Sequence, residues 1–120
     1  MKKNVLVVDD DKQILKTFTQ ILEKAGYAVD TTQTAAEAKN KLSQNHYDVA
    51  LIDIRLPDAE GTDLLRQIPE TSGTAKIIVT GYSTFEYGEK AADYGADDFL
   101  VKPIRPKQLL DSVKTWITEE

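Results

Sequence analysis

The chain has 120 residues, of which 41% are hydrophobic and 29% charged, so we expect residues 1–120 to form a single globular domain. It has no cysteine and no apolar run of about 18 residues, which excludes disulfide bonds, thiolate metal sites and a membrane span. The net charge of −5 argues against direct nucleic-acid binding, and the composition as a whole favours a cytoplasmic location.

The first predicted elements are a strand and a helix. Residues 5–8 (VLVV) are an apolar run that predicts a buried strand. Between residues 14 and 25, apolar side chains recur at the spacing of one helix face. Asp11 is expected to cap the start of this helix, and Gly26 is expected to terminate it.

Two further strand–helix units are predicted in the middle of the chain. Residues 27–29 (YAV) predict a short strand, and Thr34 with Glu37 forms a capping box that opens the next helix. Residues 49–52 (VALI) predict a third strand, buried on both faces. A short third helix is marked by Leu64, Leu65 and Ile68.

The last third of the chain repeats the pattern. Residues 76–80 (KIIVT) and 99–101 (FLV) predict the fourth and fifth strands. Between them, Ser83 and Glu86 form a capping box that predicts a fourth helix. The inner apolar stripe of the final helix is expected to consist of Leu109, Leu110, Val113, Trp116 and Ile117.

This alternation predicts an α/β fold, with a doubly wound five-stranded parallel sheet and five helices on its two faces. The most apolar strands, at 5–8, 49–52 and 76–80, are expected in the middle of the sheet, because central strands are buried on both faces. The strand order 2-1-3-4-5 of flavodoxin-like folds satisfies this condition and puts the ligand site between the first and third strands.

Acidic residues follow the two strands that flank that point. Asp9 and Asp10 come directly after the first strand, and Asp53 comes after the third. Because the carboxyl ends of parallel strands share one edge, these carboxylates are expected to converge. Mg²⁺, with Mn²⁺ as a substitute, is the oxygen-seeking cation that would relieve their repulsion. Thr80 and Lys102 end the fourth and fifth strands and complete the set of groups that phosphoryl transfer requires.

Four motifs occur in order at these strand ends: VVDDD at 7–11, LIDIRLPDAEG at 51–61, IIVTGYS at 77–83 and DDFLVKP at 97–103. With them the chain resembles the receiver domains of response regulators in two-component signalling, such as the chemotaxis regulator. The resemblance covers residues 3–117. It implies a phosphoacceptor domain served by a sensor histidine kinase, a phosphotransfer protein or a small phosphodonor. It also implies that the domain is not a turnover enzyme and catalyses only its own phosphorylation and dephosphorylation.

The resemblance assigns a role to each residue of the site. Asp53 would be the phosphoryl acceptor, Thr80 would donate its hydroxyl to the phosphoryl group, and Lys102 would pair with the phosphoryl oxygens. In the empty site Lys102 would pair with the acids instead. The implied Mg²⁺ ligands are Asp9, Asp10, Asp53 and the backbone carbonyl of Arg55.

Other positions are implied to control switching and phosphoryl lifetime. Thr80 would move toward the phosphorylated site, and the ring of Phe99 would fill the vacated space. This would change the surface of the fourth helix, fifth strand and fifth helix, which meets an unknown output partner as a monomer or as a phosphorylation-dependent homodimer. The bond before Pro103 is implied to be cis. We hypothesise that Arg55 and Tyr82 shield the phosphoaspartate and slow its hydrolysis.

Three alternatives are open on the residues alone. A haloacid-dehalogenase-like phosphatase also uses an aspartate nucleophile and Mg²⁺, but it needs an acid where this chain has Arg55. A degenerate receiver that acts only as a protein-interaction module would have a broken site, whereas every position here is filled. A nucleotide-binding module would have a phosphate loop after the first strand, where this chain has DDDK at 9–12.

Overall fold

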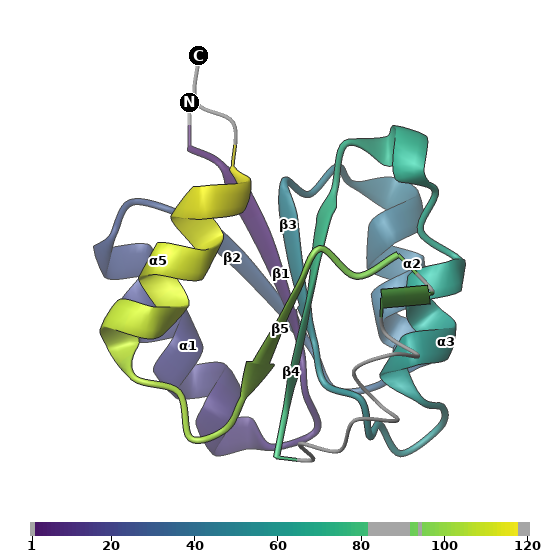
Figure 1. Cartoon of the computed structure of the whole chain (residues 1–120), viewed down its shortest axis with the longest axis horizontal. Coiled ribbons are helices and arrows are strands. Elements are labelled where there is room, and N and C mark those ends of the chain that lie inside the picture. Colours follow the sequence, from purple (N-terminus) through teal and green to yellow (C-terminus); the bar gives the residue numbers. More distant parts are fainter. Residues whose placement is uncertain (1, 82–91, 94, 118–120) are drawn as a thin grey trace.

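A computed structural model describes residues 2–81, 92–93 and 95–117, and its centre is a parallel sheet covered on both faces by helices (Figure 1). The five strands are β1 (Asn4–Val8), β2 (Ala28–Thr32), β3 (Val49–Ile52), β4 (Ala75–Thr80) and β5 (Asp98–Val101). Their order is β2-β1-β3-β4-β5, and every neighbouring pair is parallel. The predicted fold class and strand order are confirmed.

Four α-helices lie within the described residues. Helices α1 (Lys12–Lys24) and α5 (Pro106–Trp116) cover one face of the sheet, and α2 (Ala35–Gln44) and α3 (Gly61–Arg66) cover the other (Figure 1). A 3₁₀ helix, η1 (Glu70–Ser72), follows α3 and was not predicted. The helix predicted to open at Ser83 lies outside the described residues. None of the helices described here is long and apolar enough to cross a membrane.

The core consists of two apolar layers that the central strands separate. Along β1, Val5 and Val7 point into the layer beneath α1 and α5, whereas Leu6 and Val8 point into the layer beneath α2 and α3. All four are at most 1% exposed. A strand buried on both faces has no polar side, which is why VLVV reads as a continuous apolar run.

The predicted ends of α1 are confirmed. Oδ1 of Asp11 accepts the backbone N–H groups of Gln13 (2.9 Å) and Ile14 (3.4 Å), which would otherwise lack partners in the first turn. Gly26 follows the last turn with φ = +99°, a left-handed conformation that favours glycine.

The prediction for Trp116 was wrong. Leu109, Val113 and Ile117 recur every fourth residue and are buried, as expected. Trp116 precedes Ile117 and is therefore rotated by about 100° around the helix axis. It is 38% exposed, and its Nε1 donates to Oδ2 of Asp98 at 3.2 Å. Trp116 thus lies at the rim of the core and not in the inner stripe.

Candidate metal centre at the carboxyl edge of the sheet

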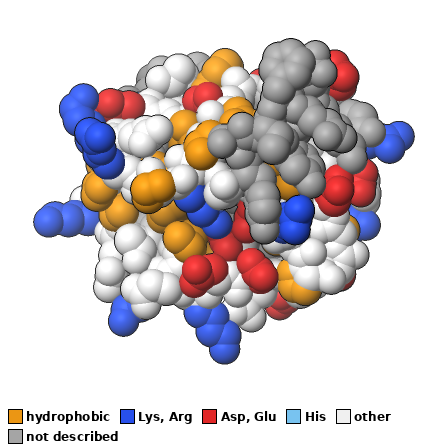
Figure 2. Space-filling model, turned by 60° about the horizontal axis from the view of Figure 1, so that its bottom comes forward, with side chains coloured by type: hydrophobic (Ala, Val, Ile, Leu, Met, Phe, Trp, Pro, Cys, Tyr) orange, Lys and Arg blue, Asp and Glu red, His pale blue; other side chains and the backbone are white. Residues whose placement is uncertain are grey.

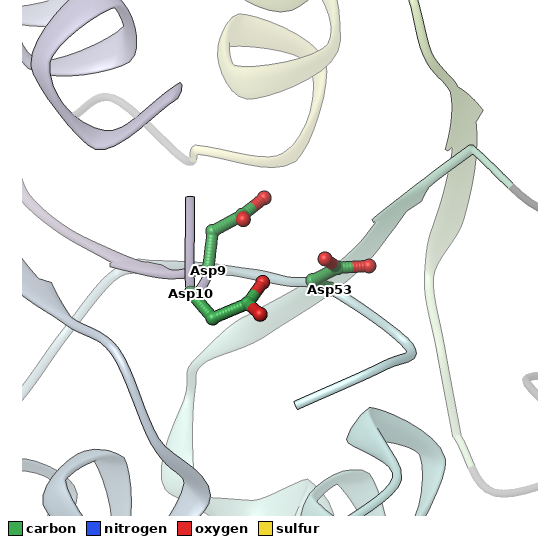
Figure 3. Close-up of side chains that lie close together, drawn as sticks. All are labelled: Asp9, Asp10 and Asp53. Carbon is green, nitrogen blue, oxygen red and sulfur yellow. The ribbon is translucent and has the colours of Figure 1, made fainter. Parts of the chain in front are cut away.

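Three carboxylates meet at the edge of the sheet where the strands end. Asp9 and Asp10 follow β1, and Asp53 follows β3, the neighbouring strand. The sheet ladder continues into them, because Asp9 N–H donates to the Thr32 carbonyl (3.1 Å) and Asp53 N–H donates to the Val8 carbonyl (2.9 Å). One carboxylate oxygen of each aspartate lies within 4.8 Å of those of the other two (Figure 3). The predicted convergence is present.

The three acids differ in their access to solvent. Asp9 is 2% exposed and Asp53 is 7% exposed, whereas Asp10 is exposed. Figure 2 turns this edge toward the viewer and shows acidic side chains gathered on it next to basic ones. A cation from solvent can therefore reach the cluster on the Asp10 side, while Asp9 and Asp53 form its buried wall.

Lys102 is the counter-ion of the buried acids. Its Nζ donates to Oδ2 of Asp9 at 2.8 Å and to Oδ2 of Asp53 at 3.4 Å, and the lysine side chain is 22% exposed. The backbone directs it there, since Lys102 N–H donates to the Thr80 carbonyl (2.7 Å) and so extends the pairing of β5 with β4. The following Lys102–Pro103 peptide bond is cis, the isomer that the resemblance implies.

The pKa values of Asp53 and Lys102 reflect this crowding. Burial raises the pKa of Asp53, and the negative charge of Asp9 adds to the rise, although the attraction of Lys102 partly offsets both. For Lys102, burial works against the charged form. However, the hydrogen bond to Asp9 and the charges of Asp53 and Asp9 outweigh burial, and the pKa of Lys102 is raised. The site therefore keeps its lysine charged beside a carboxylate that binds protons more readily than an ordinary aspartate.

The donor set fits a hard divalent cation. Within the described part of the chain, Lys102 is the cation paired with this cluster of three carboxylates, so the cluster keeps a net negative charge when all of them are ionised. Carboxylate oxygens are the preferred ligands of Mg²⁺, which also keeps several waters and tolerates an open site. Asp9, Asp10 and Asp53 are the side chains that would hold it, with Asp10 on the accessible side.

The connection from β3 to α3 is folded tightly against the acid cluster. Arg55 N–H donates to Oδ1 of Asp53 at 3.4 Å, and Arg55 pairs with Glu60 in a short antiparallel bridge. The chain then returns so closely that a Cβ at position 61 would overlap the carbonyl oxygen of Asp53. Gly61 is required for this approach, which keeps the Arg55 backbone beside Asp53.

The other predicted site residues lie nearby but are more enclosed. Thr80 is fully buried at the end of β4. Phe99, on β5, is partly buried and packs against the core layer beneath α2 and α3. The side chain of Arg55 is exposed. Tyr82, predicted to tune hydrolysis, lies outside the described residues.

One contact next to the site was missed by the sequence reasoning. The carboxylate of Asp58, in the β3–α3 connection, accepts the backbone N–H groups of Ala35 (2.8 Å) and Ala36 (2.9 Å) at the start of α2. The adjacent Pro57 and Asp58 do signal a turn. Their sequence carries no signal for the partner, because the partner groups belong to the backbone.

Comparison with known proteins gives a consistent match over nearly the whole chain. The family model described as "Response regulator receiver domain" matches residues 5–114. A receiver domain protein (CheY-like) from Methanospirillum hungatei superposes with a TM-score of 0.92 at 41% identity, covering 96% of this chain and 93% of that one. The DrrB receiver domain, in a structure described as BeF3-activated, superposes with a TM-score of 0.89 at 36% identity, covering 97% of both chains.

Curated relatives are longer than this chain. The alginate biosynthesis transcriptional regulatory protein AlgB of Pseudomonas putida is 39% identical over 106 residues, which is 88% of this chain but 24% of that protein. The matched region of that relative is therefore one part of a larger regulator.

Proposed function

The chain belongs to the response regulator receiver domain family, and on that basis we propose that it accepts a phosphoryl group on Asp53 with the help of Mg²⁺. As a receiver domain it is a signalling phosphoacceptor and not a turnover enzyme. The observation that carries the proposal is the cluster of Asp9, Asp10 and Asp53, whose carboxylate oxygens lie within 4.8 Å of one another.

Of the two buried acids, Asp53 is the better candidate for the nucleophile. Asp9 is held by short hydrogen bonds from Lys102 Nζ (2.8 Å) and from the backbone N–H of Asp11 (2.9 Å), so its oxygens are engaged. The contacts of Asp53 with Lys102 and with the Arg55 N–H are both longer, at 3.4 Å. Its raised pKa also makes its carboxylate a better nucleophile than an ordinary aspartate.

In the proposed transfer, an oxygen of the Asp53 carboxylate attacks the phosphorus of a phosphohistidine on a sensor kinase or phosphotransfer protein. A P–O bond forms, the P–N bond breaks, and the imidazole leaves with the electron pair and takes up a proton. A small phosphodonor such as acetyl phosphate would react in the same way. Mg²⁺, when bound, supplies positive charge that offsets the charges of the phosphoryl oxygens and the acids.

The remaining residues of the site would position and stabilise the group. Asp9 and Asp10, with the backbone carbonyl of Arg55, would complete the protein's share of the Mg²⁺ ligands. Lys102 already lies within reach of Asp53 and would move its hydrogen bond from Asp9 to the phosphoryl oxygens. Thr80 is fully buried at the end of β4, and its hydroxyl would reach the group through a local rearrangement.

That rearrangement supplies the proposed switch. Changing a two-state population from 1:99 to 99:1 takes about 5.5 kcal/mol of differential interaction. Hydrogen bonds to charged groups contribute about 1.5–3 kcal/mol each, so two or three new bonds to the phosphoryl oxygens suffice. Movement of Thr80 would let the ring of Phe99 shift, and the surface that includes β5 and α5 would change for an output partner. Curated relatives are longer transcriptional regulators, and by analogy that partner would be a further domain or a separate protein, which we place in the cytoplasm.

The alternatives predicted from sequence have less support. A phosphatase of the haloacid-dehalogenase type needs an acid where Arg55 stands, and the family match is to receiver domains. A degenerate receiver would lack part of the acid–lysine cluster. A nucleotide-binding module would need phosphate donors where the acids lie.

The experiment that tests the proposal is intact-mass measurement after exposure to acetyl phosphate, with and without MgCl₂. We expect the mass of one phosphoryl group on the unmodified protein only when Mg²⁺ is present, and none on Asp53→Asn. Asp111→Asn, an exposed aspartate on α5, is the matched control and should be phosphorylated normally. Equal phosphorylation of Asp53→Asn would refute the assignment of the acceptor.

A further inference from the structure

The connection between β3 and α3 is a small hairpin with its own internal bonds. Arg55 and Glu60 form its antiparallel bridge, and Leu56 N–H donates to the Ala59 carbonyl at 3.1 Å. Asp58 lies at the tip of this hairpin, away from the strand end that carries Asp53. A hairpin of this length needs an external attachment to hold its tip in one place.

Asp58 provides such an attachment with both carboxylate oxygens. Oδ1 accepts the N–H of Ala35 at 2.8 Å and Oδ2 accepts the N–H of Ala36 at 2.9 Å. These two hydrogen bonds are the main reason that the pKa of Asp58 is lowered, and Lys39 contributes further. The helix dipole also favours an anion at this position. The side chain therefore stays ionised, and two bonds fix its orientation.

The same helix end carries a second cap, Thr34, which directly precedes α2 in the chain. Oγ1 of Thr34 accepts the N–H of Glu37 at 3.1 Å, which is the usual bond from an N-cap residue. Thr34 and Asp58 thus divide the free N–H groups of the first turn of α2 between them. A variant of Thr34 weakens the helix start alone, whereas a variant of Asp58 also releases the hairpin.

The attachment closes a ring of contacts around the acid cluster. Asp9 N–H bonds to the carbonyl of Thr32 at the end of β2, and the chain enters α2 three residues later. Asp58 connects α2 to the hairpin, and the hairpin returns to Asp53 through the Arg55 N–H. The two strand ends that carry the acids are therefore joined through α2 as well as through the sheet.

We propose that Asp58 is a positioning residue of the metal centre, which holds the β3–α3 hairpin so that the backbone carbonyl of Arg55 stays in place as a cation ligand. This inference rests on the proposed function, because it concerns the same Mg²⁺ site. It assigns to Asp58 an effect on cation affinity that a helix cap alone would not have.

The test is isothermal titration of MgCl₂ into the full chain and its variants. Groups that orient metal ligands typically contribute about 10–100-fold in affinity, and because Asp58 acts on one ligand of several, we expect Asp58→Ala to weaken Mg²⁺ binding about tenfold. Asp58→Asn keeps one acceptor oxygen and should lose less Mg²⁺ affinity than Asp58→Ala. Thr34→Ala controls for the stability of α2, and Asp111→Asn controls for the loss of one exposed charge; both should stay within about twofold.

A second readout separates affinity from chemistry. At limiting Mg²⁺, acetyl phosphate should phosphorylate Asp58→Ala less than the unmodified protein, and at saturating Mg²⁺ the two should reach the same final occupancy. Equal Mg²⁺ affinity of Asp58→Ala and the unmodified protein would overturn the inference, as would an equal loss in Thr34→Ala. If Asp58→Ala does not fold, Asp58→Asn against Asp111→Asn gives the same comparison. Absence of Mg²⁺-dependent phosphorylation in the unmodified protein would instead overturn the proposed function.

Discussion

The two ends of the sheet hold aspartates in opposite ways. At the amino end, Asp48 precedes β3, Asp97 precedes β5, and Asp98 is the first residue of β5. Each of these carboxylates accepts hydrogen bonds from its own separate donors. Asp48 accepts the Asn4 N–H (2.8 Å), Asp97 accepts the Lys76 N–H (2.8 Å), and Asp98 accepts the N–H of Phe99 and the hydroxyl of Ser112. These acids stabilise the places where strands begin.

At the carboxyl end, Asp9, Asp10 and Asp53 lie together, and Asp9 and Asp53 share the ammonium group of Lys102. Asp98 at the amino end and Asp53 at the carboxyl end differ in the direction of the pKa shift. Hydrogen bonds from Ser112, Phe99 and Trp116 outweigh burial at Asp98 and lower its pKa, whereas burial and Asp9 raise the pKa of Asp53. An acid whose pKa is lowered in the folded state stabilises the fold when it is charged. An acid whose pKa is raised in the folded state destabilises the fold when it is charged. The comparison indicates that the charge of Asp53 costs the fold stability, which fits the proposal that this acid serves a ligand.

The largest expected effect comes from removing the shared lysine. Lys102→Met leaves the almost buried Asp9 without its counter-ion, and we expect a loss of about 3 kcal/mol in unfolding free energy without divalent cations. MgCl₂ should restore more stability to this variant than to the unmodified protein, because the cation no longer competes with the ammonium group. Urea unfolding measures both. Lys107→Met, which breaks the exposed pair with Asp111, is the control, and an equal loss in both variants would contradict the account.

The next largest effect is expected at Gly61, and it tests whether the close approach of the backbone to Asp53 positions the acids. Gly61→Ala puts a Cβ against the carbonyl of Asp53, so the β3–α3 connection must shift at a cost of about 2 kcal/mol. Among the described residues, no atom lies within 4 Å of a Cβ placed at Gly81, so Gly81→Ala should be nearly neutral. Thermal unfolding and Mg²⁺ titration of the pair check this. Unchanged Mg²⁺ affinity in Gly61→Ala would show that the close approach does not position the acids.

A smaller loss of stability is expected from a variant of Asp98 at the amino end of the sheet. Asp98→Asn weakens the contacts to Ser112 and Trp116, and we expect the free energy of unfolding to fall by about 1 kcal/mol at pH 7. Because the pKa of Asp98 is lowered, its contribution is present above the ordinary aspartate pKa of about 4 and is lost as the pH falls through the folded-state value. The two proteins should therefore converge in stability in acid. A difference that persists there would contradict the electrostatic explanation.

The smallest effect is expected from His46, which lies beside Asp48 at the amino end. His46 Nε2 lies 3.5 Å from Oδ1 of Asp48, but its side chain is 59% exposed, and Asp48 already accepts the Asn4 N–H. His46→Ala should change the unfolding free energy by less than about 0.3 kcal/mol. Denaturant unfolding at pH 6 and pH 8 checks this. A loss as large as that of Lys102→Met would remove the distinction between the two ends.

Much of this arrangement could be predicted from the sequence. The strand order follows from which strands are apolar on both faces, and the convergence of Asp9, Asp10 and Asp53 follows from that order. The caps at Asp11 and Thr34 are local, so a few neighbouring residues suffice to predict them.

The contacts that could not be predicted join distant segments through groups without a sequence signature. Asp58 bonds to backbone N–H groups of Ala35 and Ala36, and any residue type there except proline would offer the same donors. Trp116 was wrongly predicted to belong to the inner stripe, because the apolar spacing predicts which face of the helix is buried but not where that buried face ends. Its exposure depends on how α5 is rotated against the sheet, which the contact with Asp98 helps to fix.

The most direct test of the account compares Asp53→Asn with Asp98→Asn by urea unfolding at pH 7 without divalent cations. Replacing a buried charge by a neutral group of the same shape should raise the unfolding free energy for Asp53→Asn, by about 1 kcal/mol, while Asp98→Asn lowers it. Since the pKa of Asp53 is raised, its charge is costly only as the pH rises through that value, so the gain should vanish below about pH 4. Opposite signs at pH 7 are the predicted result. A loss of stability in both variants would mean that the carboxyl-end acids support the fold as the amino-end acids do, and would contradict the account.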